Sequence, residues 1–288
     1  MDAVTDSLRS LLHDAVAVLA EAGVPDPRVD AELLLGHVLG LRRGGVQAAL
    51  VTERAVTDAE RAELDRIVAR RANREPLQHI TGRAPFRSLD LAVGSGVFVP
   101  RPETELLAGI AIDALRAVAG EAPIAIDLGT GSGAIALALA TEVPHARVFA
   151  VEVSPEAHAW ASRNIAESGG SVDLVLGDLA TAFTELDGTV SVVASNPPYV
   201  PTGAVPRDPE VRDFDPPLAL YGGDDGLDVI RALSQRALHL LHGGGLLAIE
   251  HGELQGAAIR ELLVADGWRR PETHPDLLGR DRITTAVR

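Results

Sequence analysis

The sequence predicts an α/β protein: a Rossmann-like sheet preceded by a small N-terminal helical bundle and joined to it by a β-hairpin linker. Apolar residues follow helical spacing through residues 1–75. Residues 76–99 alternate and turn as a hairpin does, and from residue 100 short apolar strands recur, several ending in a polar side chain. We therefore expect three parts, spanning 1–75, 76–99 and 100–288.

The N-terminal part is expected to form helices, with apolar residues such as Leu8, Leu12 and Leu19 in its core. The expected helices span 7–22, 27–41, a short piece near 46–50, and 57–73. Thr57 followed by Glu60 predicts a capping box at the start of the last one. That helix also carries four arginines that we expect on one face, either as a solvated surface or as a surface for RNA or an acidic protein: Arg66, Arg70, Arg71 and Arg74.

The third part opens with a helix start at Pro102, with Glu103 and Glu105 in its first turn. An apolar strand at 124–128 then leads into a glycine-rich turn and a helical run. The residues of this turn that we expect to meet a cofactor are Asp127, Gly129, Thr130, Gly131, Ser132 and Gly133. Its glycines allow close backbone approach and offer amide donors, which predicts a nucleotide-like cofactor but does not separate a dinucleotide from other nucleotides.

Three further strands each end in a polar residue, where open α/β sheets bind ligands. The strand at 147–151 ends in Glu152, about 20 residues beyond the turn, where a carboxylate accepts from ribose hydroxyls. The strand at 172–177 ends in Asp178, which either accepts from an adenine amine or forms an exposed Gly-Asp turn. The strand at 190–195 ends in Asn196.

Asn196, Pro197, Pro198 and Tyr199 form the most informative tetrapeptide. Asn196 offers a carbonyl oxygen that accepts from an NH2 group, the prolines stiffen the turn and leave backbone carbonyls without local donors, and Tyr199 offers a stacking face. A flat, nitrogen-bearing substrate fits these groups. The other interpretation is an ordinary exit from a sheet, because proline ends central strands.

Beyond the tetrapeptide, the long acidic loop at 201–226 is either a substrate lid or docking rim, or simply solvated. We then expect a helix at 227–241, a strand at 245–250, a helix at 254–265 and an edge strand at 281–288.

The 288 residues include no cysteine, and the nine histidines show no metal-ligand spacing, so no metal is expected. A net charge of −15 disfavours a nucleic-acid substrate, and the absence of a signal peptide or long apolar span predicts a cytoplasmic protein.

The chain resembles class I S-adenosylmethionine-dependent amino-methyltransferases in four features that follow one another in the sequence. They are the segment 127–133, Glu152, the segment 177–178 and the Asn-Pro-Pro-Tyr tetrapeptide. The segments 76–82, 98–105 and 250–252 narrow the resemblance, over nearly the whole chain, to the PrmC/HemK family. That family methylates the side-chain N5 of a glutamine in peptide chain release factors.

The resemblance implies that S-adenosylmethionine is bound by the glycine-rich turn together with Glu152, Asp178, Leu179 and Asn196. Leu179 departs from the aromatic residue common at this position in the family, so adenine would be covered by aliphatic contact. Asn196, Pro197 and Tyr199 would be catalytic, and Pro198 would join them in binding substrate.

The implied partner is a class I release factor, methylated at the glutamine of its Gly-Gly-Gln motif by a cytoplasmic monomer whose N-terminal domain docks the factor. Two other interpretations remain open: methylation of an exocyclic amine of RNA or DNA, and a non-enzymatic cofactor-binding scaffold. The roles of Glu103, Glu105 and His251 are also open, between supporting the pocket and touching the substrate.

Overall fold

The structure, a computed structural model, describes residues 7–288, so the first six residues of the predicted N-terminal domain lie outside it. The chain divides into two compact units. The first runs to Gly82 and also includes Pro206–Phe214, and the second comprises Arg83–Val205 and Asp215–Arg288. Between residues 7 and 288, no helix is both long and apolar enough to cross a membrane.

The first unit is helical, as the apolar spacing predicts. Its helices are α1 (Leu8–Glu21), α2 (Pro27–Leu39), α3 (Arg43–Val51), α4 (Asp58–Ala72), α5 (Leu77–Thr81) and, from far along the chain, α9 (Pro209–Phe214). The capping box is confirmed, since Thr57 accepts from the Glu60 amide and Glu60 accepts from the Thr57 amide. Leu19, Leu34 and Ile67 are fully buried where α1, α2 and α4 meet.

The four arginines at 66, 70, 71 and 74, expected on one face that is solvated or meets RNA or an acidic protein, are instead engaged in ion pairs; the first three lie on α4 and the last just after it. Each guanidinium is paired inside this unit: Arg66 with Glu63, Arg70 with Glu75, Arg71 with Asp30 and Glu210, and Arg74 with Glu210. Arg71 is 6% exposed, and its pairing with two carboxylates accounts for that burial. These charges therefore hold the unit together, with α9 pinned to α4 through Glu210.

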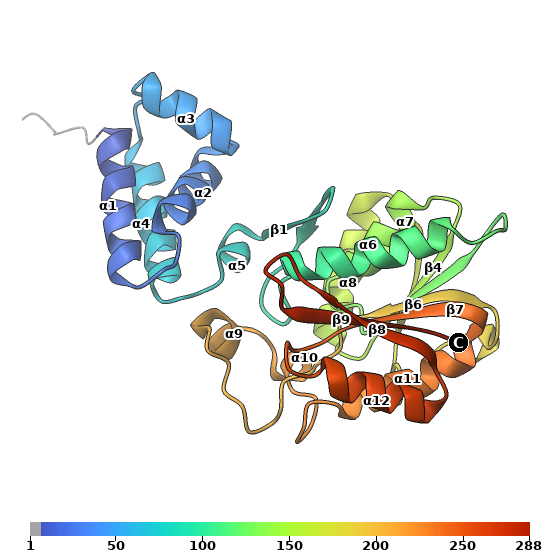
Figure 1. Ribbon diagram of the computed structural model, residues 1–288. Helices are drawn as coiled ribbons and strands as arrows, with labels where there is room; N and C mark the ends of the chain where they lie inside the picture. The colour runs from blue at the N-terminus through green and yellow to red at the C-terminus, as the bar shows by residue number, and fades with distance from the viewer. Residues whose placement is uncertain (1–6) are drawn as a thin grey trace, which may run out of the picture. The chain divides into compact units, whose positions relative to one another are not determined.

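The second unit holds a two-stranded hairpin and a seven-stranded sheet (Figure 1). The hairpin pairs β1 (Arg83–Phe86) with β2 (Leu89–Ala92) and is shorter than the predicted 76–99 segment, which begins with α5. The sheet has the order β5-β4-β3-β6-β7-β9-β8. Its strands are β3 (Ile124–Leu128), β4 (Arg147–Glu152), β5 (Val172–Leu176), β6 (Val190–Ser195), β7 (Leu241–Glu250), β8 (Arg269–Pro275) and β9 (Asp281–Val287).

The strands β3 to β7 run parallel, and β9 pairs antiparallel with both β7 and β8. The prediction that the C-terminal strand is an edge strand is therefore wrong, because β8 takes the edge. The sequence of β8 is charged, contains two prolines and does not alternate, which suits an edge position but hides the strand from pattern analysis. The interior position of β9 agrees with its run of four buried residues.

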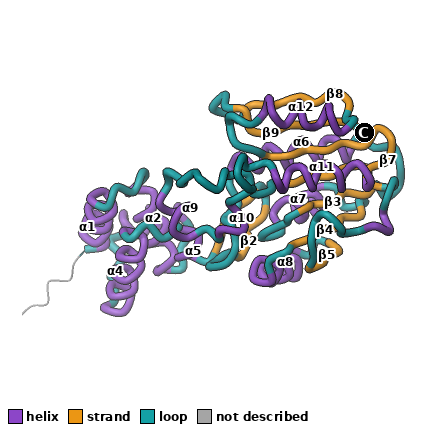
Figure 2. Tube along the Cα trace, turned by 90° about the horizontal axis from the view of Figure 1, so that it is seen from below, coloured by secondary structure: helices purple, strands orange, loops and turns teal. Residues whose placement is uncertain are grey.

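Helices cover both faces of the sheet (Figures 1 and 2). One face packs against α6 (Pro102–Arg116) and α7 (Ala134–Glu142), with α8 (Pro155–Ser168) beside β4 and β5. The other face packs against α11 (Asp228–Leu240) and α12 (Gly256–Asp266). Two short turns, η1 (Thr184–Leu186) and α10 (Pro217–Leu220), lie in the connections.

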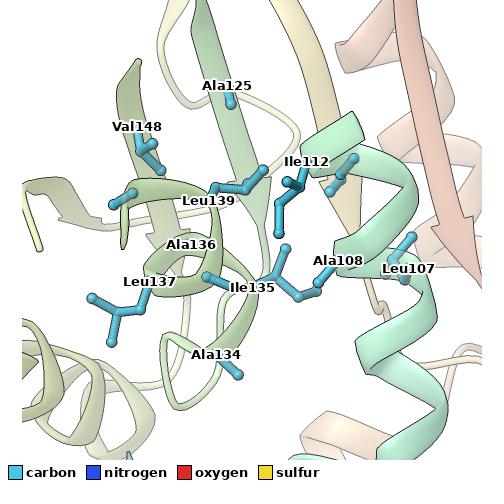
Figure 3. Packing of buried hydrophobic residues seen from close by; sticks show 14 of the residues in the cluster. Leu107, Ala108, Ile112, Ala125, Ala134, Ile135, Ala136, Leu137, Leu139 and Val148 are labelled. Atoms are coloured by element: carbon cyan, nitrogen blue, oxygen red, sulfur yellow. The ribbon is translucent and has the colours of Figure 1, made fainter. Parts of the chain in front are cut away.

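Successive side chains of β3 point to opposite faces of the sheet and so pack in the two hydrophobic clusters on those faces. Ala125 belongs to the cluster under α6 and α7, and Ile126 to the cluster under α11 and α12. Figure 3 shows Ile112 of α6 facing Leu139 of α7 in the first cluster. Residues 134–140 of α7 are all apolar and all buried, as expected for a helix that is covered on nearly all sides. The helix begins shortly after the carboxyl end of β3.

Candidate active site

Four parallel strands end at one edge of the sheet and bring the predicted site residues together. The strand order reverses at β3: the chain continues to β4 and β5 on one side of it and then returns to β6 and β7 on the other side. Such a reversal of strand order is where open α/β sheets bind ligands. The ends of β3, β4, β6 and β7 supply Asp127, Glu152, Asn196 and Glu250, respectively.

The glycine-rich turn is held mainly by short-range hydrogen bonds. Asp127 Oδ2 accepts from the Thr130 hydroxyl at 2.6 Å and from the Ala136 amide at 3.1 Å. Gly129, Gly131 and Gly133 all have positive φ, at 79°, 58° and 85°. L side chains rarely adopt these angles, which explains why this turn needs glycine.

The turn also faces open space, as a ligand site requires. A Cβ atom added at Gly129 or Gly131 would meet no other atom within 4 Å. Glu152, at the end of β4, accepts from the Gly131 amide at 2.8 Å through Oε2 and from the Ser154 amide at 2.9 Å through Oε1. The carboxylate thus fixes the tip of the turn.

Asp127 is fully buried, and this burial raises its pKa to about 7. Hydrogen bonds from Thr130 and Ala136 oppose the rise. Its second oxygen, Oδ1, accepts no hydrogen bond from any residue between 7 and 288. The buried carboxyl therefore retains an acceptor beside the glycine-rich turn.

The residues expected around adenine lie after the exposed strand β5. Asp178 is exposed and accepts from the Ala180 amide at 2.9 Å, which is the Gly-Asp turn that the sequence left as an alternative. Leu179 is half-buried against the cluster under α11 and α12. Ser132 lies inside the turn, where its carbonyl accepts from Asn164 of α8 at 2.8 Å.

The Asn-Pro-Pro-Tyr turn follows β6 and is held by distant segments. The Asn196 Nδ2 group donates to the hydroxyl oxygen of Thr104, in the first turn of α6, at 3.2 Å. The Tyr199 carbonyl accepts from Gln255 Nε2 at 2.9 Å. Asn196 is half-buried and Pro197 is buried, so one end of the asparagine amide is fixed by protein contacts.

Burial raises the pKa of Tyr199 to about 12, and the charge of Glu250 adds to the rise. Glu250 is 2% exposed, and burial raises its pKa to about 7, while the neighbouring Thr104 and Asn196 side chains lower it. Its Oε2 accepts no hydrogen bond from the described residues. A carboxyl group that titrates near neutrality therefore lies behind Asn196.

The three residues whose roles the sequence left open are engaged in structural contacts. Glu103 pairs with Arg280 at 3.0 Å, and Glu105 accepts from the Arg87 amide at 2.9 Å. His251 is fully buried, with Nδ1 2.9 Å from the Gly252 carbonyl and Nε2 2.8 Å from the Thr284 hydroxyl. Burial lowers the pKa of His251, which keeps the ring neutral.

Sequence reasoning missed Thr104, Glu250 and Gln255 as parts of this site. Thr104 and Glu250 lie in two of the segments that carry the family resemblance, 98–105 and 250–252, but no local pattern links them to Asn196. Ninety-two residues separate Thr104 from Asn196 in the chain. No cluster of His, Asp or Glu suited to a metal ion occurs in the part of the chain that the structure describes.

Comparison with known proteins identifies the family. Residues 10–82 match the PrmC N-terminal domain, and residues 109–208 match the methyltransferase small domain. The chain is 52% identical to the release factor glutamine methyltransferase of Streptomyces coelicolor over 93% of both chains. It is also 38% identical, over 100% of this chain and 97% of the other, to a 4-amino-L-phenylalanine/4-methylamino-L-phenylalanine methyltransferase of Streptomyces pristinaespiralis.

Among solved structures, the T. thermophilus 16S rRNA N2 G1207 methyltransferase, in complex with AdoMet and guanosine, aligns with a TM-score of 0.53. The alignment covers 72% of this chain and 49% of the other at 20% identity, a likeness that concerns the fold. It confirms the predicted class I methyltransferase fold. With its full-length relatives at up to 52% identity, the chain belongs to the release factor glutamine methyltransferase family.

Proposed function

We propose that this enzyme transfers a methyl group from S-adenosylmethionine to the side-chain amide nitrogen of the glutamine in the Gly-Gly-Gln motif of class I release factors. The observation that carries the proposal is the fixed amide of Asn196. Because its Nδ2 group donates to Thr104, its Oδ1 atom is left to accept an N–H group from a substrate. Its relatives, which are release factor glutamine methyltransferases, support glutamine as the substrate.

The residues at the carboxyl ends of β3, β4 and β5 fit the cofactor. The open space before Gly129 and Gly131 admits a ligand close to the backbone, and the free acceptor of Asp127 lies beside it. Glu152 would accept from the ribose hydroxyls, while Asp178 and Leu179 would contact adenine. When bound, S-adenosylmethionine supplies an electrophilic methyl group, whose C–S bond breaks as the N–C bond forms.

The contribution of the protein is to orient a weak nucleophile. The lone pair of an amide nitrogen is delocalised into its carbonyl group, so attack needs a pyramidal nitrogen. Asn196 Oδ1 and the Pro197 carbonyl would accept the two N–H groups and hold that geometry, with Pro198 stiffening the turn. Tyr199 would pack on the amide plane, and its raised pKa keeps its hydroxyl neutral.

No strong base is required near the nitrogen, because its proton becomes acidic once the nitrogen is alkylated and then leaves to water. A neutral asparagine suits this site, since a carboxylate at the same position would have to be desolvated. We further propose that the helical unit docks the release factor and that one copy of the enzyme acts alone in the cytoplasm. Its homology to the PrmC N-terminal domain supports the docking role.

The test is a methyl-transfer assay with labelled S-adenosylmethionine and unmodified release factor. A factor with the motif glutamine substituted, bulk RNA and 4-amino-L-phenylalanine are the comparison acceptors, the last because of the 38% identical relative. Peptide mass mapping should place the label on the one glutamine. Label on RNA or on the free arylamine, with none on the factor, would overturn the substrate assignment.

A further inference from the structure

The geometry points to a positioning function for Thr104 and Glu250: they fix the orientation of the Asn196 amide through a hydrogen-bond relay that runs from Asn196 to Thr104 to Glu250. This inference rests on the proposed function, in which Asn196 Oδ1 accepts a substrate N–H group. It concerns two residues that do not themselves touch the substrate.

Thr104 can mediate between the other two because a hydroxyl both accepts and donates. Its oxygen accepts from Asn196 Nδ2 at 3.2 Å, which leaves the hydroxyl proton to be donated elsewhere. Thr104 is 4% exposed, so water does not readily take that proton. The backbone of Thr104 is fixed in the first turn of α6, where its amide donates to the Arg101 carbonyl at 3.1 Å.

Glu250 is placed to accept that proton. It is 2% exposed and lies at the end of β7, beside the end of β6 that carries Asn196. The neighbouring side chains of Thr104 and Asn196 favour its charged form. An ionised carboxylate only accepts, so Thr104 must donate to it and present its lone pair to Asn196. The asparagine NH2 group then faces the interior, and the oxygen faces the substrate.

Protonation of Glu250 would remove this constraint. A carboxylic acid also donates, so the direction of the relay is no longer fixed and the asparagine oxygen can turn inward. The charged groups facing Glu250 are Arg282 from β9, which lowers its pKa, and Glu103 from α6, which raises it. Tyr199 also faces Glu250, from the turn after β6.

A buried polar trio without such a function would be costly, since each group must be desolvated and one carboxylate oxygen remains without a donor. Aliphatic residues of similar volume would pack there at lower cost. A function in orienting Asn196 Oδ1, the proposed substrate acceptor, would explain why Thr104 and Glu250 are retained behind it despite this cost.

The first test observes the asparagine amide without any substrate. The sequence contains three asparagines, at 73, 164 and 196, so asparagine-selective ¹⁵N labelling gives three side-chain NH2 signals. We expect the Asn196 signal to titrate near pH 7, and Glu250→Gln to abolish that titration. Thr104→Val should shift the same signal, and Thr104→Ser should restore it. An Asn196 signal that ignores both pH and Thr104→Val overturns the relay.

The second test measures turnover on release factor. Thr104→Val should lower kcat by about 10- to 100-fold, as a small misplacement of an orienting group does, with KM and cofactor Kd little changed. Thr104→Ser should recover to within about 3-fold, because it restores the hydroxyl. Thr141→Val is the matched control: it also loses one hydroxyl hydrogen bond, to the Leu137 carbonyl in α7, and should leave kcat unchanged.

The two tests separate this inference from the proposed function. If wild type labels the factor but Thr104→Val turns over normally, the relay is wrong and the function stands. If wild type does not label the factor, the function is wrong, and the ¹⁵N titration still decides whether the relay exists. Far-UV circular dichroism and cofactor binding show whether the Thr104 variants are folded.

Discussion

The glycine-rich turn after β3 and the Asn-Pro-Pro-Tyr turn after β6 end neighbouring strands, yet they are held in different ways. In the first, Asp127 bonds residues three and nine positions away, and Glu152 bonds the turn from 21 positions away. In the second, Thr104 bonds Asn196 across 92 positions and Gln255 bonds Tyr199 across 56. A cofactor site can thus be a nearly self-contained motif, whereas this substrate turn depends on the assembled domain.

The largest expected effect separates the two turns directly. Asn196→Ala should lower kcat by about 100- to 1,000-fold, the usual loss when one orienting polar group is removed. The cofactor Kd should change by less than about 3-fold, since the glycine-rich turn keeps its own hydrogen bonds. Single-turnover kinetics and calorimetry measure the two quantities. Retained turnover with factor and cofactor both saturating would remove Asn196 from the mechanism.

The converse variant is Glu152→Ala, which should weaken cofactor binding while leaving kcat at saturation nearly unchanged. The carboxylate bonds the Gly131 amide, and hydrogen bonds to charged groups contribute about 1.5–3 kcal/mol, or roughly 10- to 150-fold in Kd. Glu156→Ala, four positions on and exposed, is the control and should leave Kd unchanged. Equal losses in both variants would mean that charge alone matters.

Each turn also has one buried carboxyl with a raised pKa, Asp127 on one side and Glu250 on the other, both near 7. In the folded protein these groups hold protons that the unfolded chain releases near pH 4 to 4.5. Their contribution to stability is therefore full below pH 4 and is lost as the pH rises to about 7.

We thus expect the Tm of the ligand-free protein to carry a downward contribution between pH 4.5 and 7. The carboxyls with lowered pKa values, Glu60, Glu210 and Asp225, titrate near 2 and act below this window. Asp127→Asn and Glu250→Gln should each flatten the slope measured by calorimetry. A slope unchanged in both variants would contradict the raised pKa values.

The smallest expected effect concerns Leu179, the half-buried residue proposed to cover adenine. Leu179→Phe should tighten cofactor binding by about 2- to 10-fold, the range expected for an added aromatic stacking contact of about 0.5–1.5 kcal/mol. Leu179→Met, which keeps an aliphatic-like surface, should leave Kd within about 2-fold. Unchanged affinity in both would place adenine away from this residue.

The features predicted correctly from the sequence are those coded by neighbouring residues. Examples are the capping box at Thr57, the helices of the N-terminal part and the strand that ends in Asn196. Each of these patterns lies within one element. The interior position of β9 was missed, since it depends on an edge strand whose sequence does not alternate. The ion pairs of Arg71 and Arg74 were missed because their partner Glu210 comes from a segment far along the chain.

The insertion of Pro206–Phe214 into the helical unit constrains how this gene can be divided or recombined. A clone that starts at residue 83 would carry α9 without Arg71 and Arg74, and so leave Glu210 without its two cations. Exchange of the helical unit between relatives therefore requires two grafts, one up to residue 82 and one at 206–214. The helical unit therefore cannot be exchanged as one continuous segment, because residues 206–214 of the unit are encoded within the methyltransferase part of the gene.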